Sequence, residues 1–304
     1  MVLAVPRNHP SPGQWGPWGS PESPTTASTT ATIPANTAIV TSTSSDAPSP
    51  SSSSTSSTSG DCSTSSSEDS LLYSGPFTIN NNLWGMSTGT GSQCLNSASG
   101  GNPVAWSTTW SWENTAADVS GENYIKSYAN AYDPSIACQA LSNYKSIPTS
   151  WTWRNILTAG PISYDVSQNA ISADVSYDVF FGGSECVAPG PTYPIEVMVW
   201  LGAYGGLVPI GGSAASIGSV VSDDITFNLF SGTNTATGST VYSFVVADGS
   251  LQNSYSGDLL PFFTYLEKFE SGLSGMLLQS IQAGTEAATG SATFSTSSYT
   301  INSS

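Results

Sequence analysis

Apolar and polar residues alternate with a period of two in several short runs after residue 70. The clearest runs cover residues 170–179 and 193–201, and residues 241–246 and 291–301 alternate less cleanly. Successive side chains of a strand point to opposite faces, and many short strands between turn signals are typical of an antiparallel sandwich. The pattern therefore predicts an all-β fold, a β-jelly roll sandwich of two antiparallel sheets.

One segment, residues 256–269, departs from this period. Its apolar residues recur at helical spacing, Ser256 is placed to cap a helix, and Pro261 falls early enough for a first turn. The apolar positions are Leu259, Phe262, Phe263, Leu266 and Phe269. We expect one α-helix on an otherwise all-β chain.

The composition changes near residue 70. Residues 1–60 are rich in Ser, Thr and Pro and contain few large apolar side chains, so they bury too little surface to offset the entropy of ordering. We expect a disordered tail over residues 1–60, either an O-glycosylated stalk or a segment without a role. Residues 61–304 then form the jelly-roll domain.

Charge excludes several classes of partner and of chemistry. The 304-residue chain has 21 acidic and 5 basic residues and a net charge of −16, so it lacks a basic surface for nucleic acid or an anionic membrane. Its one histidine, His9, lies in the tail, which disfavours histidine-dependent triads and histidine-rich zinc sites. Carboxylates are the available acid–base groups. No apolar run is long enough to span a membrane, and residues 1–10 do not resemble a signal peptide.

The cysteines are well separated and form no CxxC motif. An even number of cysteines with this spacing suits an oxidising compartment and two disulfides, although four free thiols are an alternative and three pairings are open. The four residues are Cys62, Cys94, Cys138 and Cys186.

Two predicted strands each carry a glutamate on a polar face. Glu196, Met198 and Trp200 share one face of their strand, which suits a sugar-binding groove because indole rings stack on pyranose rings and a carboxylate can act at the anomeric carbon. The alternative is a second buried face. Glu286 shares its face with Ser280, Gln282 and Gly284, where the glycine would let a ligand approach the backbone.

Further polar and aromatic residues fall on strand faces. One strand has Asp174 and Asp178 on the face of Ser172 and Ser176, and near residue 80 a strand would place Asn80, Asn82 and Trp84 together. For the other tryptophans we expect core packing, because no carboxylate alternates with them. These are Trp106, Trp110, Trp112, Trp151 and Trp153.

Ordered sequence blocks over about residues 71–304 resemble glycoside hydrolase family 12. The blocks include Asn81-Asn82-Leu83-Trp84-Gly85, Ser176-Tyr177-Asp178-Val179-Phe180, Glu196-Val197-Met198-Val199-Trp200-Leu201, Pro209-Ile210-Gly211, Tyr255-Ser256-Gly257-Asp258 and Gly284-Thr285-Glu286. The resemblance implies a jelly roll with one helix, a concave sheet that forms the substrate groove, and retaining endo-hydrolysis of β-1,4-glucans.

By this resemblance Glu196 is the nucleophile, Glu286 is the general acid/base, and Asp178 lies against the nucleophile. Substrate-binding positions are implied for six residues: Asn82, Trp84, Met198, Trp200, Pro209 and, more weakly, Asn234. Cys62 and Cys94 resemble the family's N-terminal disulfide, which leaves Cys138 with Cys186 by subtraction. The expected protein is a secreted monomer that acts on β-glucan and needs neither metal nor organic cofactor.

One departure from the family concerns the residues after Glu286. The family has proline and phenylalanine there, whereas this chain has Ala287 and Ala288, a change expected to admit water and lower the pKa of Glu286. The small Ala283 resembles the xyloglucan-acting branch and suggests a wider groove. Two other readings stay open: a catalytically decayed sugar-binding or host-recognised protein on the same fold, and a structural wall protein.

Overall fold

A computed structural model describes residues 67, 70–114, 125–157, 171–183, 185, 193–235 and 237–304. The predicted tail, residues 1–60, lies outside the described residues, as do Cys62 and Cys186.

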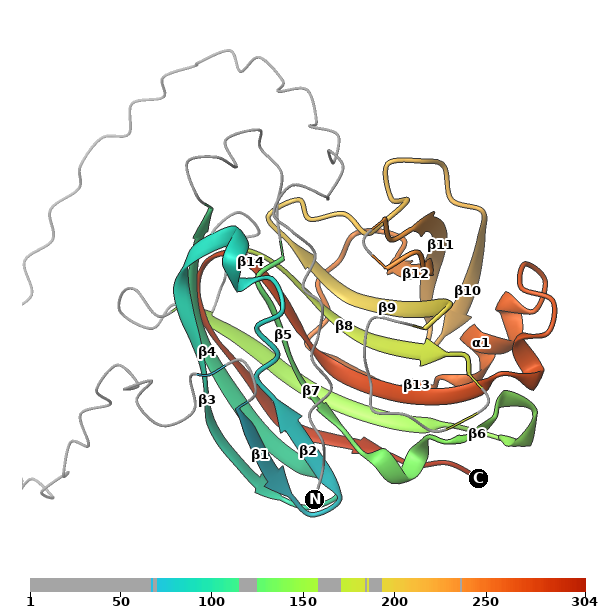
Figure 1. Cartoon of the computed structure of the whole chain (residues 1–304), viewed down its shortest axis with the longest axis horizontal. Coiled ribbons are helices and arrows are strands. Elements are labelled where there is room, and N and C mark those ends of the chain that lie inside the picture. Colours follow the sequence, from blue (N-terminus) through green and yellow to red (C-terminus); the bar gives the residue numbers. More distant parts are fainter. Residues whose placement is uncertain are drawn as a thin grey trace, which may run out of the picture.

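Two curved layers of strands pack face to face (Figure 1). Of these, β14 belongs to both layers. The strands of the described part are β1 (Leu71–Ser74), β2 (Phe77–Asn80), β3 (Gly89–Gly100), β4 (Val104–Asn114), β5 (Ser127–Tyr132), β6 (Gln139–Ala140), β7 (Pro148–Leu157), β8 (Ser172–Phe181), β9 (Ile195–Tyr204), β10 (Gly218–Ser222), β11 (Ile225–Thr233), β12 (Thr240–Val246), β13 (Ser254–Asp258) and β14 (Leu277–Ile301).

The first sheet has the strand order β1-β2-β5-β14-β8-β9-β12-β11-β10. The second sheet joins β3, β4, β14, β7 and β13. The expected all-β sandwich is confirmed, with one difference from a wholly antiparallel arrangement. The pair β9–β12 is parallel, because β10 and β11 intervene in the chain and β12 returns beside β9 in the same direction.

The main core lies between the two sheets. It contains the five tryptophans for which core packing was expected, each at most 2% exposed, and Trp151 donates a hydrogen bond through Nε1 to Thr296 Oγ1 at 3.0 Å. The core faces of β8, β9 and β14 follow the predicted alternation, with Val175, Val199 and Ile281 pointing inward. Because one face of each strand is used here, their other faces all lie on the opposite side of the first sheet.

The predicted helix is present but shorter than residues 256–269. Helix α1 spans Leu260–Leu266 with Pro261 in its first turn, as expected. Ser256 does not cap it, because Ser256 lies in β13, and the Leu260 N–H donates instead to Asp258 Oδ1 at 2.9 Å. Phe269 lies beyond the helix and is 40% exposed, whereas the other predicted apolar positions are buried.

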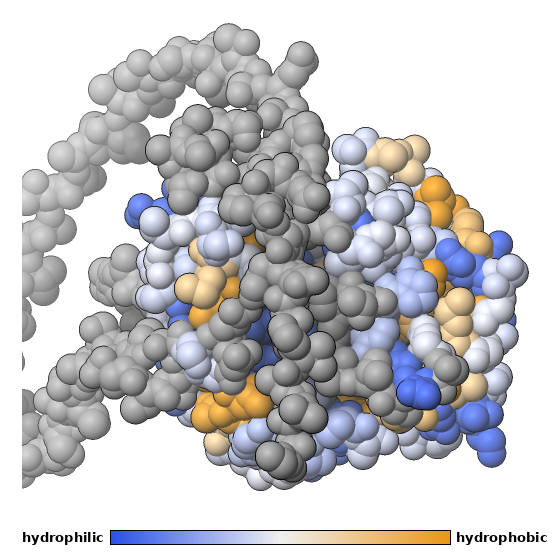
Figure 2. Space-filling model, viewed as in Figure 1, coloured by the Kyte–Doolittle hydropathy of each residue, from blue (hydrophilic) through white to orange (hydrophobic). Residues whose placement is uncertain are grey.

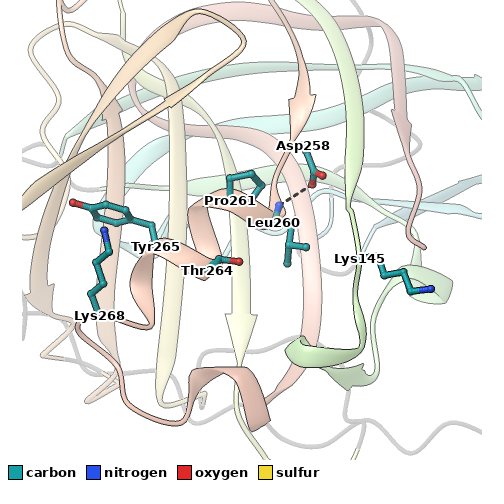
Figure 3. Close-up of a pocket in the computed structure, with 7 residues that line it drawn as sticks. All are labelled: Lys145, Asp258, Leu260, Pro261, Thr264, Tyr265 and Lys268. Atoms are coloured by element: carbon teal, nitrogen blue, oxygen red, sulfur yellow. Dashed lines mark hydrogen bonds between the residues drawn. The ribbon is translucent and has the colours of Figure 1, made fainter.

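Beside α1 lies a shallow pocket of about 500 Å³ (Figure 3). Lys145 and Lys268 stand at its two ends, and the Lys268 ammonium lies 3.8 Å from the centre of the Tyr265 ring. None of the carboxyls of β8, β9 or β14 lines it. Hydrophobic residues on the visible surface form separate patches among hydrophilic ones (Figure 2). Among the described residues, no helix has the length and apolar character needed to cross a bilayer.

Candidate active site

Four carboxyls gather on the face of the first sheet that points away from the main core. They are Asp174 and Asp178 on β8, Glu196 on β9 and Glu286 on β14, and we call them the carboxyl cluster. Strand β8 lies between β14 and β9, so it separates the two glutamates. The two aspartates are 0% and 7% exposed, whereas both glutamates are only half-buried. The glutamates are therefore the most exposed members of the cluster.

The strand register places the glutamates on opposite sides of a shared floor. Glu196 pairs with Phe180 at one end of β8, and Glu286 lies at the level of Asp174 near the other end, since Gly284 pairs with Ser176 and Ala287 with Ala173. The strands of this sheet are strongly curved (Figure 1). Burial raises the pKa of Glu286 most, and the charges of Asp174, Asp178 and Glu196 raise it further.

The floor between the glutamates is built from two rows of paired residues. Asp178 pairs with Met198 and with Gln282, and Ser176 pairs with Trp200 and with Gly284. Trp200 Nε1 lies 3.4 Å from Met198 Sδ, and the two side chains belong to a small apolar cluster with Leu207 and Val241 that is separate from the main core. Little of either side chain is exposed, 5% for Met198 and 3% for Trp200.

Burial raises the pKa of every member of the carboxyl cluster. The pKa rises to about 7 for Glu196 and to about 7 for Asp174, in both cases mainly because burial disfavours the charged form. The pKa of Asp178 rises well above its usual value through burial and then through the charges of Glu196 and Asp174. The pKa of Glu286 also rises well above its usual value, through burial and then the charges of Asp174, Asp178 and Glu196. At neutral pH the cluster thus holds protons that exposed carboxyls would have lost.

Ala287 and Ala288 directly follow Glu286 on β14. Both alanines are 0% exposed, Ala287 belongs to the main core, and the Ala287 carbonyl accepts a hydrogen bond from the Lys126 N–H at 2.7 Å. Burial and neighbouring carboxyls raise the pKa of Glu286 above its usual value. The effect of the two alanines relative to the family's proline and phenylalanine stays a prediction.

The segment that carries Asn82 and Trp84 is a loop rather than a strand. Strand β2 ends at Asn80, and Asn82 has a φ of 46°, so the expected sharing of one strand face by Asn80, Asn82 and Trp84 is wrong. The Asn82 N–H donates to Asn80 Oδ1 at 3.0 Å, and the Asn82 carbonyl accepts from the Tyr128 N–H at 2.9 Å. Since Tyr128 pairs with Glu286, the loop is anchored to the row of the second glutamate.

The other two predicted binding residues lie in connections at the edge of this face. Pro209 is buried in the segment between β9 and β10 and accepts a hydrogen bond from the Gly212 N–H at 2.8 Å. Asn234 follows β11 and is half-buried, and its N–H donates to the Ser239 carbonyl at 2.9 Å. Thr233 pairs with Thr240 on β12, and Thr240 pairs with Ile195 on β9. Asn234 comes directly after Thr233, and Glu196 comes directly after Ile195.

Two small residues on β14 are explained by packing. A Cβ on Gly284 would clash with the Ala129 carbonyl oxygen and with Asn130, so the close approach of β5 by itself requires a glycine here. Ala283 is 0% exposed and faces the main core. It does not border the floor, and its small size does not widen a groove there.

Asp174 is the residue that sequence reasoning left without a role. Its placement on the same strand face as Asp178 was visible from the alternation, but nothing in the sequence put it opposite Glu286. Cys94 and Cys138 are both disulfide-bonded, and their expected partners Cys62 and Cys186 lie outside the described residues, so the pairing stays a prediction.

Comparison with known proteins identifies the family of this chain. The sequence model of glycosyl hydrolase family 12 matches residues 75–303. The chain belongs to glycosyl hydrolase family 12. Among curated relatives, a probable xyloglucan-specific endo-β-1,4-glucanase A of Aspergillus fumigatus is 39% identical over 75% of this chain and 86% of its own length. The xyloglucan-specific endo-β-1,4-glucanase A of Aspergillus aculeatus is 41% identical over the same shares.

Solved structures of family 12 share the fold. The crystal structure of Trichoderma harzianum endoglucanase 3 is 29% identical with a TM-score of 0.67, over 79% of this chain and 96% of that one. The catalytic domain of Humicola grisea Cel12A, solved with a thio-cellotetraose, is 27% identical with a TM-score of 0.64, over 77% and 96%. The jelly-roll architecture expected from the sequence is therefore the family 12 fold.

Proposed function

We propose that the protein hydrolyses internal β-1,4-glucosidic bonds of a β-glucan by double displacement, with Glu196 as nucleophile and Glu286 as general acid and base. The observation that carries this proposal is the pair of half-buried glutamates on either side of one floor, within electrostatic reach of each other. Two carboxyls on either side of a glycosidic bond are the apparatus that such hydrolysis needs.

The order of proton affinities suits these roles. Glu286, whose pKa is raised by burial and then by three neighbouring carboxyls, keeps its proton and donates it to the glycosidic oxygen as the C–O bond breaks. Glu196, whose pKa burial raises to about 7, attacks the anomeric carbon in its ionised form. Water then attacks the glycosyl-enzyme, gives its proton to Glu286 and releases Glu196. No step in this sequence calls for a metal or an organic cofactor.

Asp178 supports the nucleophile in this mechanism. It lies beside Glu196 and its Oδ1 has no hydrogen-bond partner among the described residues. Because the charge of Glu196 raises the pKa of Asp178, a protonated Asp178 is placed to stabilise ionised Glu196 and to share its proton.

For the substrate we favour xyloglucan. The relatives with the highest identity reported above are xyloglucan-specific endo-β-1,4-glucanases, which supports a branched glucan although the reason first drawn from Ala283 fails. The disulfide-bonded Cys94 and Cys138 support action outside the cell, in an oxidising environment. We further propose a monomer with a catalytic domain over residues 61–304.

The deciding experiment measures reducing ends released from xyloglucan, carboxymethylcellulose and mixed-linkage glucan. We expect the highest rate on xyloglucan, and a loss of several orders of magnitude in Glu196→Gln and in Glu286→Gln. Glu267→Gln, at an exposed position after α1, is the matched control and should keep full activity. Proton NMR of the first product should show the β-anomer. Full activity in Glu196→Gln would refute the nucleophile assignment, and inactivity of the unmodified protein on all three glucans would favour a decayed sugar-binding protein.

A further inference from the structure

Asp174 and Glu286 are cross-strand neighbours on the exposed side of the first sheet. Between the pairs Gly284–Ser176 and Ala287–Ala173 the register is unbroken, so Glu286 on β14 lies opposite Asp174 on β8. Directly opposed residues have Cβ atoms about 4.5–5.5 Å apart. Burying an ionised carboxylate at this distance from a second carboxyl costs free energy unless one of the two is protonated or hydrogen-bonded.

Two hydrogen bonds tie Asp174 to neighbouring residues of β14. The Glu286 N–H donates to Asp174 Oδ1 at 2.8 Å, and Thr285 Oγ1 donates to the Asp174 carbonyl at 2.6 Å. Asp174 Oδ2 has no such partner among the described residues, although Asp174 is 0% exposed. One oxygen of Asp174 thus holds the main chain of Glu286, and the other is left for the carboxyl of Glu286 itself.

We propose that Asp174 is the positioning residue of the general acid: it fixes the backbone of Glu286 and shares one proton with the Glu286 carboxyl. This inference rests on the proposed function, in which that proton is the one given to the glycosidic oxygen. Asp174 does not contact the substrate in this scheme, because it is fully buried beside a half-buried glutamate.

The charges around Glu286 explain why Asp174 is the residue that matters. Glu286 faces Asp174 and Asp178 from β8, Glu196 from β9 and Tyr128 from β5. After burial, the charge of Asp174 is the largest cause that raises the pKa of Glu286, ahead of the charges of Asp178 and Glu196. Two opposed carboxyls cannot both ionise at low cost, so the proton belongs to the pair.

The shared proton serves both steps of the proposed reaction. In the first step Glu286 gives the proton to the leaving oxygen as the glycosidic bond breaks, and Asp174 keeps its hydrogen bond to the Glu286 N–H. Glu286 is then an anion opposite a second anion, which makes it a strong base. In the second step it therefore takes the proton from the attacking water readily, and the starting state is restored.

The test compares the titration of Glu286 in the unmodified protein and in Asp174→Asn, followed by carbon-13 NMR of labelled side-chain carboxyls. The Glu286 signal is assigned by its absence in Glu286→Gln. The amide introduced by Asp174→Asn keeps an oxygen that can accept from the Glu286 N–H but carries no charge. We expect the titration midpoint of Glu286 to fall by about one pH unit or more and kcat to fall while KM changes little.

Asp248→Asn is the matched control, because it removes one charge at an exposed turn, and it should leave the midpoint of Glu286 unchanged. An unchanged midpoint in Asp174→Asn would overturn the proposal. This outcome is distinct from failure of the proposed function, which would appear as retained hydrolysis in Glu286→Gln. If Asp174→Asn does not fold, Asp174→Ser takes its place, because it also removes the charge, and an unchanged midpoint there would overturn the proposal as well.

Discussion

Asp178 lies one diagonal step from Glu196 across the boundary between β8 and β9, because Asp178 pairs with Met198 and Phe180 pairs with Glu196. Diagonal neighbours on one face of a sheet are within reach of long side chains. Asp178 is 7% exposed, whereas Glu196 is half-buried. The pair therefore has one more exposed carboxyl, that of Glu196, and one buried carboxyl, that of Asp178.

This relationship predicts the effect of Asp178→Asn. The amide keeps the shape of the carboxyl but cannot exchange a proton with Glu196, so kcat/KM should fall by about 10- to 100-fold with little change in Tm. Steady-state kinetics on xyloglucan and a thermal melt measure the two quantities. Asp224→Asn, an exposed change of the same kind, should alter neither. Unchanged kinetics in Asp178→Asn would remove Asp178 from the site.

Gly284→Ala should disrupt the site by displacing a strand rather than by blocking a ligand. The new Cβ would clash with the Ala129 carbonyl oxygen and Asn130, which forces β5 and β14 apart next to Glu286. Overpacking of this kind costs about 1–3 kcal/mol of unfolding free energy. Urea denaturation measures the cost, and activity should fall in parallel. The control is Gly101→Ala, whose Cβ meets nothing within 4 Å; equal stability of the two variants would contradict the proposed steric cause.

Much of the sheet that carries the site follows from alternation alone. The faces of β8 and β9 were predictable because each strand has one continuous apolar face, and the tryptophans of β4 and β7 fell in the core for the same reason. The pattern could not show that residues 277–301 form one strand shared by two sheets, since a strand that changes partners keeps the same period.

The parts of the site that escaped prediction depend on register and on special backbone conformations. Asn82 adopts a positive φ, and this conformation ends the alternation of the strand. Asparagine tolerates a positive φ, so no glycine in the sequence marks the turn. The pairing of Asp174 with Glu286 joins residues more than one hundred positions apart, and only the register of β8 with β14 reveals it. Ala283 was placed beside the groove by resemblance, but it is one position out of phase with Gln282 and Gly284 and so faces the core.

The disulfide pairing is open to a direct test. We predict Cys62 with Cys94 and Cys138 with Cys186, and Cys94 and Cys138 are both oxidised in the structure. Non-reducing peptide mapping by mass spectrometry should recover these two linked pairs. Loss of a native disulfide typically costs about 2–5 kcal/mol, so Cys138→Ser should lower Tm while Ser142→Ala, at a nearby exposed position, should not. A linked pair that contains both Cys94 and Cys138 would show the assignment to be wrong.

Stability should fall as the pH rises through the range in which the carboxyl cluster loses its protons. For Glu196 the pKa rises from 4.5 to about 7 on folding, and the pKa values of Asp174, Asp178 and Glu286 rise as well. Between about pH 4.5 and about pH 7 the folded state therefore binds more protons than the unfolded state. For each extra proton bound by the folded state, the unfolding free energy falls by about 1.4 kcal/mol as the pH rises by one unit in that window.

Urea denaturation across this range measures the slope of unfolding free energy against pH. Glu196→Gln cannot ionise and should show a shallower slope, whereas Glu267→Gln should keep the full one. A stability that rises with pH, as for carboxylates held charged in the folded state, would show that the cluster is ionised and hydrated instead.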